Sequence, residues 1–212
     1  MDETAPKMAV IVAHPDDETL WAGGTMLLHP GWAKWVVALC RQSDPDRAPR
    51  FRAAVAHLGA EGRMADLDDG PEQRPLAPRE VRAAMMDLVG ERSYDLLLTH
   101  APGGEYTRHL RHTEVSCAAA ALWTEGRLRA RRLWLFAYED GGGAYAPRAR
   151  PNAHLHLRLP AAIWREKLRL VTDTYGFTPE SFEARTTPRT EAFWCFSSPD
   201  QFAAWHNRGV LR

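Results

Sequence analysis

The sequence predicts an α/β fold built on a Rossmann-like, doubly wound, mostly parallel sheet, and two observations support this prediction. Short apolar segments typical of buried strands alternate along the chain with longer segments that carry helix start and stop signals. Such alternation is typical of units in which a right-handed crossover helix joins two parallel strands. The chain also has 212 residues and 45% hydrophobic content, which suffices for one core. We therefore expect a single domain over residues 1–212.

Five segments predict strands. Four of them are short apolar runs, as expected of strands that helices cover on both faces. Pro15 ends the first run. The last segment, from His154 to Leu159, alternates polar and apolar residues, as a half-exposed strand does. In chain order, the predicted strands span residues 7–13, 35–40, 94–99, 132–138 and 154–159.

Five further segments predict helices. Pro49 suits the first turn of the second helix, and Gly59 suits its end. In the first helix, Gly23 and Gly24 are small enough to allow close packing on the preceding strand. The predicted helices span residues 18–28, 50–58, 78–89, 112–123 and 161–174.

A glycine-rich segment at residues 139–147 interrupts this pattern, and we expect it to be a mobile loop that acts as a hinge or lid near the site. Gly141-Gly-Gly143 does not resemble a phosphate-binding loop, because no Lys-Ser/Thr pair follows it. The first strand and helix lack the spaced glycines of a dinucleotide site, which counts against an oxidoreductase.

The overall composition excludes several classes of partner. Lysine plus arginine and aspartate plus glutamate number 27 each, so no net charge attracts the chain to nucleic acid or to an anionic membrane. No window approaches the roughly 18 apolar residues of a membrane span, and the N-terminus opens with acidic Asp2 and Glu3 instead of a basic leader. The odd number of well-separated cysteines argues against a disulfide framework and against a cysteine-based zinc site. We expect a cytoplasmic protein. The sequence leaves open whether it forms a homo-oligomer.

Polar clusters follow three of the predicted strands. They are residues 14–17 after the first strand, 41–44 after the second and 100–106 after the strand at 94–99. Because ligands of open parallel sheets bind beyond the carboxyl ends of the strands, we expect these clusters to form one site.

Two of these segments have the residues of a hydrolytic zinc site, which needs three nitrogen or oxygen ligands and one open position. His14 and Asp17 lie in a tight loop, so both can reach one ion while Asp16 points elsewhere. Helix capping by the two aspartates is the alternative interpretation. His109 and His112 stand three residues apart at a predicted helix start, so they share a face. The alternative for this pair is a solvated helix face.

Other aromatic and histidine residues have simpler interpretations. The chain has eight tryptophans, and Trp21, Trp32 and Trp35 lie near the first polar loop. Core packing is favoured for them over stacking on a sugar ring. His154 and His156 share one face of the last predicted strand, and we interpret them as exposed polar positions instead of a second metal site.

The hexapeptide Ala13-His-Pro-Asp-Asp-Glu18 resembles the signature of the PIG-L family of zinc de-N-acetylases, also called LmbE-like proteins. The resemblance covers most of the first 140 residues. It continues through Arg47 ahead of Leu58-Gly59, then Gly104-Glu-Tyr106, and then the His109/His112 pair. Beyond that point the matches are Lys167 in a helix and Glu191-Ala-Phe193.

This resemblance implies an LmbE-like fold, a Zn²⁺ cofactor, and removal of an N-acetyl group from an N-acetylglucosamine-like amino sugar or conjugate. It implies zinc ligation by His14, Asp17 and His112. Asp16 would be the general base, while protonated His109 or Tyr106 would stabilise the charge that develops on the amide oxygen. The resemblance also implies contacts to sugar hydroxyls, made by Arg47 and Asp69.

The sequence departs from the family pattern at positions beside the site. Thr107 and Arg108 separate Tyr106 from the histidine pair, where members commonly have one residue. Arg111, between the histidines, occupies a position where members often have aspartate, and Arg50 falls where a glutamate is usual.

The substrate is left open by these matches. One alternative is a zinc amidase that acts on another N-acyl small molecule, such as a secondary-metabolite intermediate. Another is a catalytically inactive homologue that binds a metal or a ligand. The C-terminal third, about residues 140–212, matches the family least, and we expect it to be the substrate-specific part.

Overall fold

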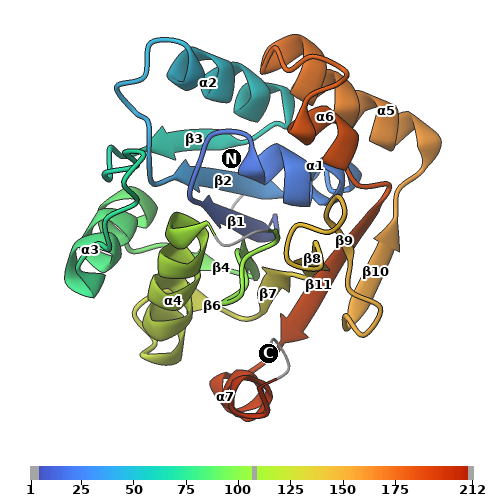
Figure 1. The fold of residues 1–212 in the computed structure, drawn as a ribbon. Helices are drawn as coiled ribbons and strands as arrows, with labels where there is room; N and C mark the ends of the chain where they lie inside the picture. Colours follow the sequence, from blue (N-terminus) through green and yellow to red (C-terminus); the bar gives the residue numbers. More distant parts are fainter. Residues whose placement is uncertain (1–4, 107–108, 210–212) are drawn as a thin grey trace.

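A seven-stranded sheet forms the middle of the molecule, in the order β10-β11-β7-β5-β1-β2-β3 (Figure 1). This structure is a computed structural model that describes residues 5–106 and 109–209, so Asp2, Glu3, Thr107 and Arg108 lie outside it. The strands are β1 (Lys7–Val12), β2 (Ala33–Ala38), β3 (Glu61–Met64), β5 (Leu96–Thr99), β7 (Leu133–Phe136), β10 (Leu155–Arg158) and β11 (Thr190–Phe196). Two short pairs accompany the sheet, namely β4 (Ser93–Tyr94) with β6 (Arg129–Ala130), and β8 (Tyr138–Glu139) with β9 (Arg148–Ala149).

The sheet is mostly parallel, as predicted. β1 pairs in parallel with β2 on one side and β5 on the other, so that Val10 lies beside both Val36 and Leu98. β3 and β7 extend this parallel part in the two directions. β11 runs antiparallel to both β7 and β10, which makes the remaining edge antiparallel.

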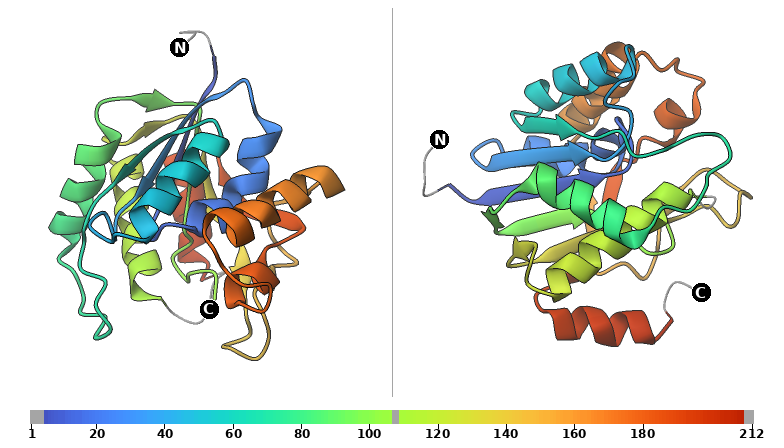
Figure 2. Two further views of the ribbon diagram at one scale, coloured as in Figure 1. Left: turned by 90° about the horizontal axis from the view of Figure 1, so that it is seen from above. Right: turned by 90° about the vertical axis from the view of Figure 1, so that its left-hand side faces the viewer.

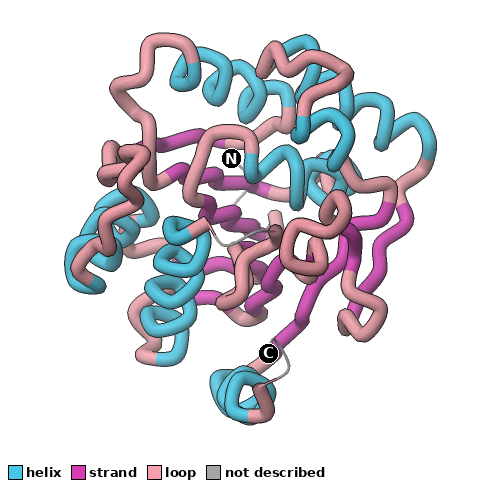
Figure 3. Tube along the Cα trace, viewed as in Figure 1, coloured by secondary structure: helices cyan, strands magenta, loops and turns pink. Residues whose placement is uncertain are grey.

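Helices cover both faces of the sheet, which confirms the doubly wound class. Figure 2 shows α3 and α4 on one face and α1, α2 and α5 on the other, and Figure 3 shows the strands enclosed between these two helical layers. The helices are α1 (Asp17–Leu28), α2 (Arg47–His57), α3 (Pro78–Val89), α4 (Leu110–Thr124), α5 (Ala161–Arg169), α6 (Phe182–Thr186) and α7 (Pro199–Asn207), with a π-helix η1 (Leu170–Thr174) that continues α5. Among the described residues, no helix combines the length and the apolar character needed to cross a membrane.

Burial explains why the central strands read as continuous apolar runs. All residues of β1 from Met8 to Val12 are buried, because α1 packs on one face and α4 on the other. An apolar side chain is therefore favoured at every position of the strand and not only at alternate ones. β10 lies at the edge of the sheet and keeps the polar and apolar alternation of a half-exposed strand.

Three of the predicted elements differ from the structure, and several further elements were not predicted. The strand predicted at 94–99 is divided into β4 and β5, and the one at 132–138 into β7 and β8. The helix predicted at 161–174 changes into a π-helix over its last turn. Six elements were not predicted, and they are β3, β6, β9, β11, α6 and α7.

The first helix packs closely on a different partner from the predicted one. A Cβ atom at Gly24 would lie 2.4 Å from Leu159 and 2.9 Å from Glu191, so no larger residue fits there. Glu191 of β11 accepts hydrogen bonds from the amides of Gly24 and Thr25 at 2.7 Å each. It also pairs with Lys167 of α5 at 2.6 Å, and both side chains are fully buried. Gly24 therefore allows α1 to approach the C-terminal strands closely, while the helix also packs on β1.

Candidate active site

The loops after β1 and β5 form the site, at the point where the winding of the sheet reverses. The chain adds β2 and β3 on one side of β1, and β5 and β7 on the other. Ligands of open α/β sheets bind in the crevice at such a switch point. His14 follows β1, and His112 lies in α4, the helix that follows β5. The sheet topology thus brings together residues that lie 98 positions apart.

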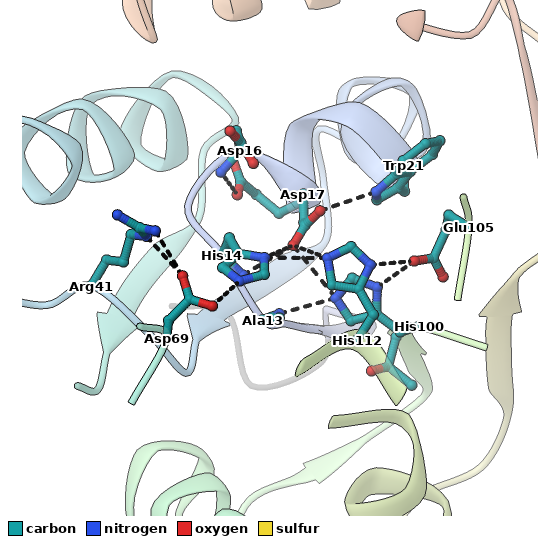
Figure 4. A network of polar contacts seen from close by, with 12 residues as sticks. Ala13, His14, Asp16, Asp17, Trp21, Arg41, Asp69, His100, Glu105 and His112 are labelled. Carbon is teal, nitrogen blue, oxygen red and sulfur yellow. Dashed lines mark hydrogen bonds and ion pairs between the residues drawn. The ribbon is translucent and has the colours of Figure 1, made fainter. Parts of the chain in front are cut away.

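Three of the predicted site residues converge on one point (Figure 4). His14 Nδ1, Asp17 Oδ2 and His112 Nε2 lie 3.2 Å from one another, pair by pair. A tetrahedral zinc ion with bonds of about 2.0–2.1 Å places its ligand atoms about 3.3 Å apart. The donor types and their spacing therefore fit a zinc ion with one further position open.

Each of the two histidines is oriented by a carboxylate behind it. Asp69 Oδ1 lies 3.1 Å from His14 Nε2, and Glu105 Oε2 lies 2.7 Å from His112 Nδ1. Since ionised carboxylates only accept hydrogen bonds, the histidine nitrogens that face them carry the protons. The other two ring nitrogens, His14 Nδ1 and His112 Nε2, face each other, and each can offer a lone pair to a metal ion once it has lost its proton.

The electrostatics of the site favour a positive charge at this point. Burial disfavours a charged His112 ring, but Asp17 and Glu105 outweigh burial and raise the pKa of His112 to about 10. Burial also opposes ionisation of Asp17, yet His112 and His100 hold its pKa well below the usual range. A proton or a metal ion can supply the charge, and metal binding displaces the proton.

Three further groups of described residues overlap this point, namely His14 with His109 and His112, and two others that are weaker metal sites. His100 and His112 approach Asp17, but His100 Nε2 accepts from the Ala13 amide at 3.0 Å and Nδ1 faces Glu105 at 2.8 Å, so both ring nitrogens are engaged. Cys40 approaches His14 and Asp69. Burial raises the pKa of the Cys40 thiol to about 12, which disfavours the thiolate that a metal requires.

Asp16 lies beside the three converging atoms in a strained backbone conformation. Its φ of 113° is rare for a residue with a side chain. The Asp16 amide donates to Glu18 Oε2 at 3.0 Å, and the hydroxyls of Thr19 and Tyr175 hold Glu18 Oε1. The Asp16 side chain makes no capping hydrogen bond, which argues against the helix-cap interpretation. Burial and the neighbouring Asp17 and Glu18 raise the pKa of Asp16 well above its ordinary value.

His109 and Tyr106 border the same point. The His109 ring lies 4.4 Å from His14 and 4.9 Å from His112, centroid to centroid, so the pair is not a solvated helix face. Burial and these two histidines lower the pKa of His109 to about 4, which favours the neutral form of the ring. Burial raises the pKa of Tyr106 well above its ordinary value, so its hydroxyl stays protonated.

These residues line one pocket of about 210 Å³. His112 is buried behind His14 and does not line it. Arg47 lies 3.5 Å from Asp16 and packs over Phe177, while Asp69 also binds Arg41 at 2.8 Å. The lining residues are His14, Pro15, Asp16, Asp17, Leu20, Arg41, Arg47, Asp69, Tyr106, His109, Phe182 and Glu183.

The two arginines that depart from the family pattern are turned away from this pocket. The buried Arg111 side chain bonds to the Arg74 carbonyl at 2.7 Å and to Glu114 at 2.5 Å. It thereby holds the loop that carries Asp69 against α4. Arg50 donates to the Thr174 carbonyl at 3.2 Å and ties α2 to the π-helix.

Sequence reasoning missed four supporting residues. Glu105 orients His112, His100 holds Glu105, and Glu18 holds the Asp16 backbone. Trp21 was expected in the core and is fully buried, but its indole also donates to Asp17 Oδ1 at 3.2 Å. Glu105 stands inside a matched tripeptide and Glu18 ends the matched hexapeptide, so a signal existed for both. Nothing in the sequence distinguishes the supporting role of Trp21.

The remaining tryptophans and histidines have the simpler roles that were expected. Trp35 is buried, and Trp32 packs against the core and against the His29 ring. His154 Nδ1 bonds to the Cys195 backbone, and His156 Nε2 bonds to the Arg150 carbonyl.

Comparisons with known proteins agree with this fold. The PIG-L family, described as GlcNAc-PI de-N-acetylase, matches residues 9–123. The chain is 29% identical to 1D-myo-inositol 2-acetamido-2-deoxy-alpha-D-glucopyranoside deacetylase 1 of Saccharopolyspora erythraea, with 55% of this chain and 54% of that protein aligned. It therefore spans about half the length of this curated relative.

Solved structures show the same architecture at low identity. An N,N'-diacetylchitobiose deacetylase from Pyrococcus horikoshii superposes with a TM-score of 0.68 and 16% identity, over 92% of this chain and 85% of that one. GalB, the 4-carboxy-2-hydroxymuconate hydratase of Pseudomonas putida KT2440, superposes with a TM-score of 0.63 and 16% identity, over 90% of this chain and 95% of that one.

The fold and the converging histidines and aspartate define an LmbE-like α/β protein with a candidate metal site. The family match covers more than half of the chain. The chain belongs to the PIG-L family.

Proposed function

We propose that the chain is a zinc-dependent hydrolase that removes the N-acetyl group from an N-acetylglucosamine-like amino sugar or a conjugate of one. The observation that carries this proposal is the convergence of three donor atoms at 3.2 Å in one pocket with Asp16. The relatives named as deacetylases support the choice of reaction. The likeness to GalB concerns the fold alone, and fold by itself does not determine the reaction.

His14, Asp17 and His112 would hold the zinc ion. When bound, zinc supplies a Lewis acid for the amide carbonyl and lowers the pKa of a coordinated water toward neutrality. Asp69, Trp21 and Glu105 then act as positioning residues, because each fixes the orientation of one ligand.

Asp16 transfers the proton in this proposal. Its raised pKa suits a carboxyl group that must both accept and release a proton near neutral pH. The water oxygen adds to the carbonyl carbon as its proton passes to Asp16. The C–N bond then breaks, the nitrogen takes that proton, and the products are acetate and a free amine.

Tyr106 and His109 stabilise the negative charge that develops on the carbonyl oxygen. Both side chains line the pocket, and both act as neutral hydrogen-bond donors, as their pKa shifts indicate. Arg47 and Asp69 line the same pocket and are proposed to contact substrate hydroxyls. Since Asp69 already binds His14 and Arg41, it couples substrate binding to the orientation of His14.

Two variants of adjacent residues test this proposal. Asp16→Asn should retain zinc and lose roughly 10²–10⁴-fold in kcat, the range typical of a general base. Asp17→Ala should lose the zinc and reduce the activity to background. Metal content and acetate release from a panel of N-acetylated amino sugars are measured for both variants and for the unmodified chain, with and without a chelator.

The outcomes separate the alternatives that the sequence left open. Acetate release confined to N-acylated compounds other than amino sugars would identify a zinc amidase with a different substrate. Stoichiometric zinc with no hydrolysis of any amide, and no effect of Asp16→Asn, would identify an inactive homologue. Full activity and full metal content in both variants would refute the assignment of the site.

A further inference from the structure

A second cavity opens directly beside the reaction pocket. The reaction pocket has a volume of about 210 Å³, less than the roughly 300 Å³ at the lower end of small-molecule sites. The neighbouring cavity has a volume of about 450 Å³. Tyr106 and Phe182 line both, so they form the boundary between the two spaces. A substrate larger than the reacting group can therefore extend past this pair.

Aromatic side chains form the walls at this boundary. The ring centroids of Tyr106 and Phe182 lie 5.0 Å apart, and Tyr106 lies 5.4 Å from the His112 ring. The second cavity thus begins one aromatic ring away from a proposed zinc ligand. Phe182 keeps 43% of its surface exposed, and it is the one large apolar side chain among the described residues that counts as exposed. Its free face is available to a flat apolar group.

Tyr145 forms a further wall, and its position is held by three contacts. Its hydroxyl donates to Glu139 at 2.7 Å, and the Arg148 guanidinium lies 3.8 Å from its ring centroid. The third contact is with Gly141, which has a φ of +62° and at which a Cβ would lie 2.4 Å from the Tyr145 ring. Glycine is therefore required for this packing. The glycine-rich loop between β8 and β9 presents Tyr145 to the cavity.

Among the described residues that line the second cavity, two have charged side chains, Arg185 and Asp140. Arg185 of α6 lines the cavity, is exposed, and forms no ion pair with any other residue that the structure describes. Asp140 also lines the cavity, but one of its oxygens accepts from the Gly142 amide at 3.0 Å. Of the described residues at this rim, Arg185 is therefore the one whose guanidinium can bind an anion.

We infer that this second cavity binds an aromatic ring with an anionic substituent, attached to the amino sugar on the side away from the acetyl group. Phe182 and Tyr145 contact the ring, and Arg185 pairs with the anion. The inference rests on the proposed deacetylase function, because it names the class of conjugate that the same site accepts. It also gives a specific role to the C-terminal third of the chain.

Three β-glycosides of N-acetylglucosamine test the inference, with methyl, phenyl and 4-carboxyphenyl groups as the aglycone. The phenyl glycoside should have a kcat/KM roughly tenfold above the methyl glycoside, because the ring gains aromatic contacts. The carboxylate should add about another threefold to tenfold through its charge-assisted hydrogen bonds to Arg185. Equal kcat/KM values for all three glycosides, together with measurable turnover, would overturn the inference and leave the proposed function intact.

Two variants assign the effect to this cavity. Phe182→Ala should reduce the ratio of phenyl to methyl turnover, and Arg185→Ala should remove only the added effect of the carboxylate. Arg129→Ala is the matched control, since Arg129 is also exposed but lies before β7, at the opposite end of the strands. The inference would be contradicted if the turnover of the phenyl and 4-carboxyphenyl glycosides, relative to the methyl glycoside, changed equally in all three variants.

Binding measurements keep the two proposals separable. Calorimetric titration with the 4-carboxyphenyl β-glycoside of glucosamine, the deacetylated product, needs no turnover. Binding at least about tenfold tighter than that of the methyl β-glycoside, and weakened by Phe182→Ala and Arg185→Ala, would support the cavity assignment even if no acetate is released. Equal affinity for the two glycosides would overturn it.

Discussion

The proposed reacting groups and the residues that line the second cavity come from different parts of the chain. His14, Asp16, Asp17 and His112 all lie within residues 9–123, the part that the family pattern matches. The second cavity is lined mainly by the β8–β9 loop and by α6, from the C-terminal third. A parallel sheet with a switch point can therefore place the proposed reacting atoms, while an added antiparallel edge shapes the space around them.

The C-terminal third also stabilises α1 and the loop that precedes it through buried hydrogen bonds. Glu191 of β11 and Lys167 of α5 hold α1, the helix that begins at Asp17. The Tyr175 hydroxyl holds Glu18, which fixes the strained Asp16 backbone. Residues 9–123 therefore provide the proposed reacting groups, and contacts from the C-terminal third hold those groups in position.

The largest expected effect comes from breaking the buried ion pair. Glu191→Leu should lower the free energy of unfolding by about 3–5 kcal/mol, because it leaves the Lys167 ammonium buried without its partner. Urea denaturation measures this change. The double variant Lys167→Met/Glu191→Leu should recover part of the loss, since it leaves no unpaired charge. Equal stability of the single and double variants would show that the pair is not the tie between the regions.

A smaller effect is expected from the carboxylate behind His112. Glu105→Gln should weaken zinc binding by about 10–100-fold, the range found when a group that orients a metal ligand is lost. Glu105 accepts from His100, His112 and the Ala101 amide, so a glutamine would point an NH₂ group at one of these donors. Competition with a chelator measures the affinity. Glu80→Gln, on the exposed side of α3, is the control and should bind zinc as the unmodified chain does.

The smallest effect tests the contact between the two regions at Asp16. Tyr175→Phe removes one hydrogen bond to buried Glu18, a change of about 1–2 kcal/mol. We expect kcat to fall by up to about tenfold, with KM and zinc content unchanged, because Asp16 is less firmly positioned. Steady-state kinetics measure kcat and KM separately. Tyr94→Phe, a buried tyrosine that bonds to the Val89 carbonyl, should leave kcat unaffected.

Most of the parallel half of the fold followed from local pattern. Buried runs such as residues 7–13 and helix signals such as Pro49 and Gly59 are set by neighbours in sequence, so they can be recognised without coordinates. β3 escaped prediction because Glu61, Gly62 and Arg63 are exposed at a sheet edge and have no apolar pattern. α6 is only 5 residues long, too short to show a helical period.

The site was predictable to the extent that its residues lie in contiguous motifs. The role of Asp69 is different, because it depends on a 3.1 Å contact with His14 across 55 positions, which local sequence does not encode. The neutral state of His109 likewise depends on burial beside His14 and His112. Both facts arise only after the strands have been paired.

The sequence by itself determined the alternating strands and helices and the motif that brings His14, Asp16 and Asp17 into one short loop. These features depend on side-chain periodicity and on chain stiffness over a few residues. Three further contacts are visible only in the folded protein, because Asp69 holds His14, Glu191 holds α1, and Phe182 lies between two cavities. The physical reason is that each of these contacts joins residues distant in sequence, which meet only when the sheet order and the helix packing have been set.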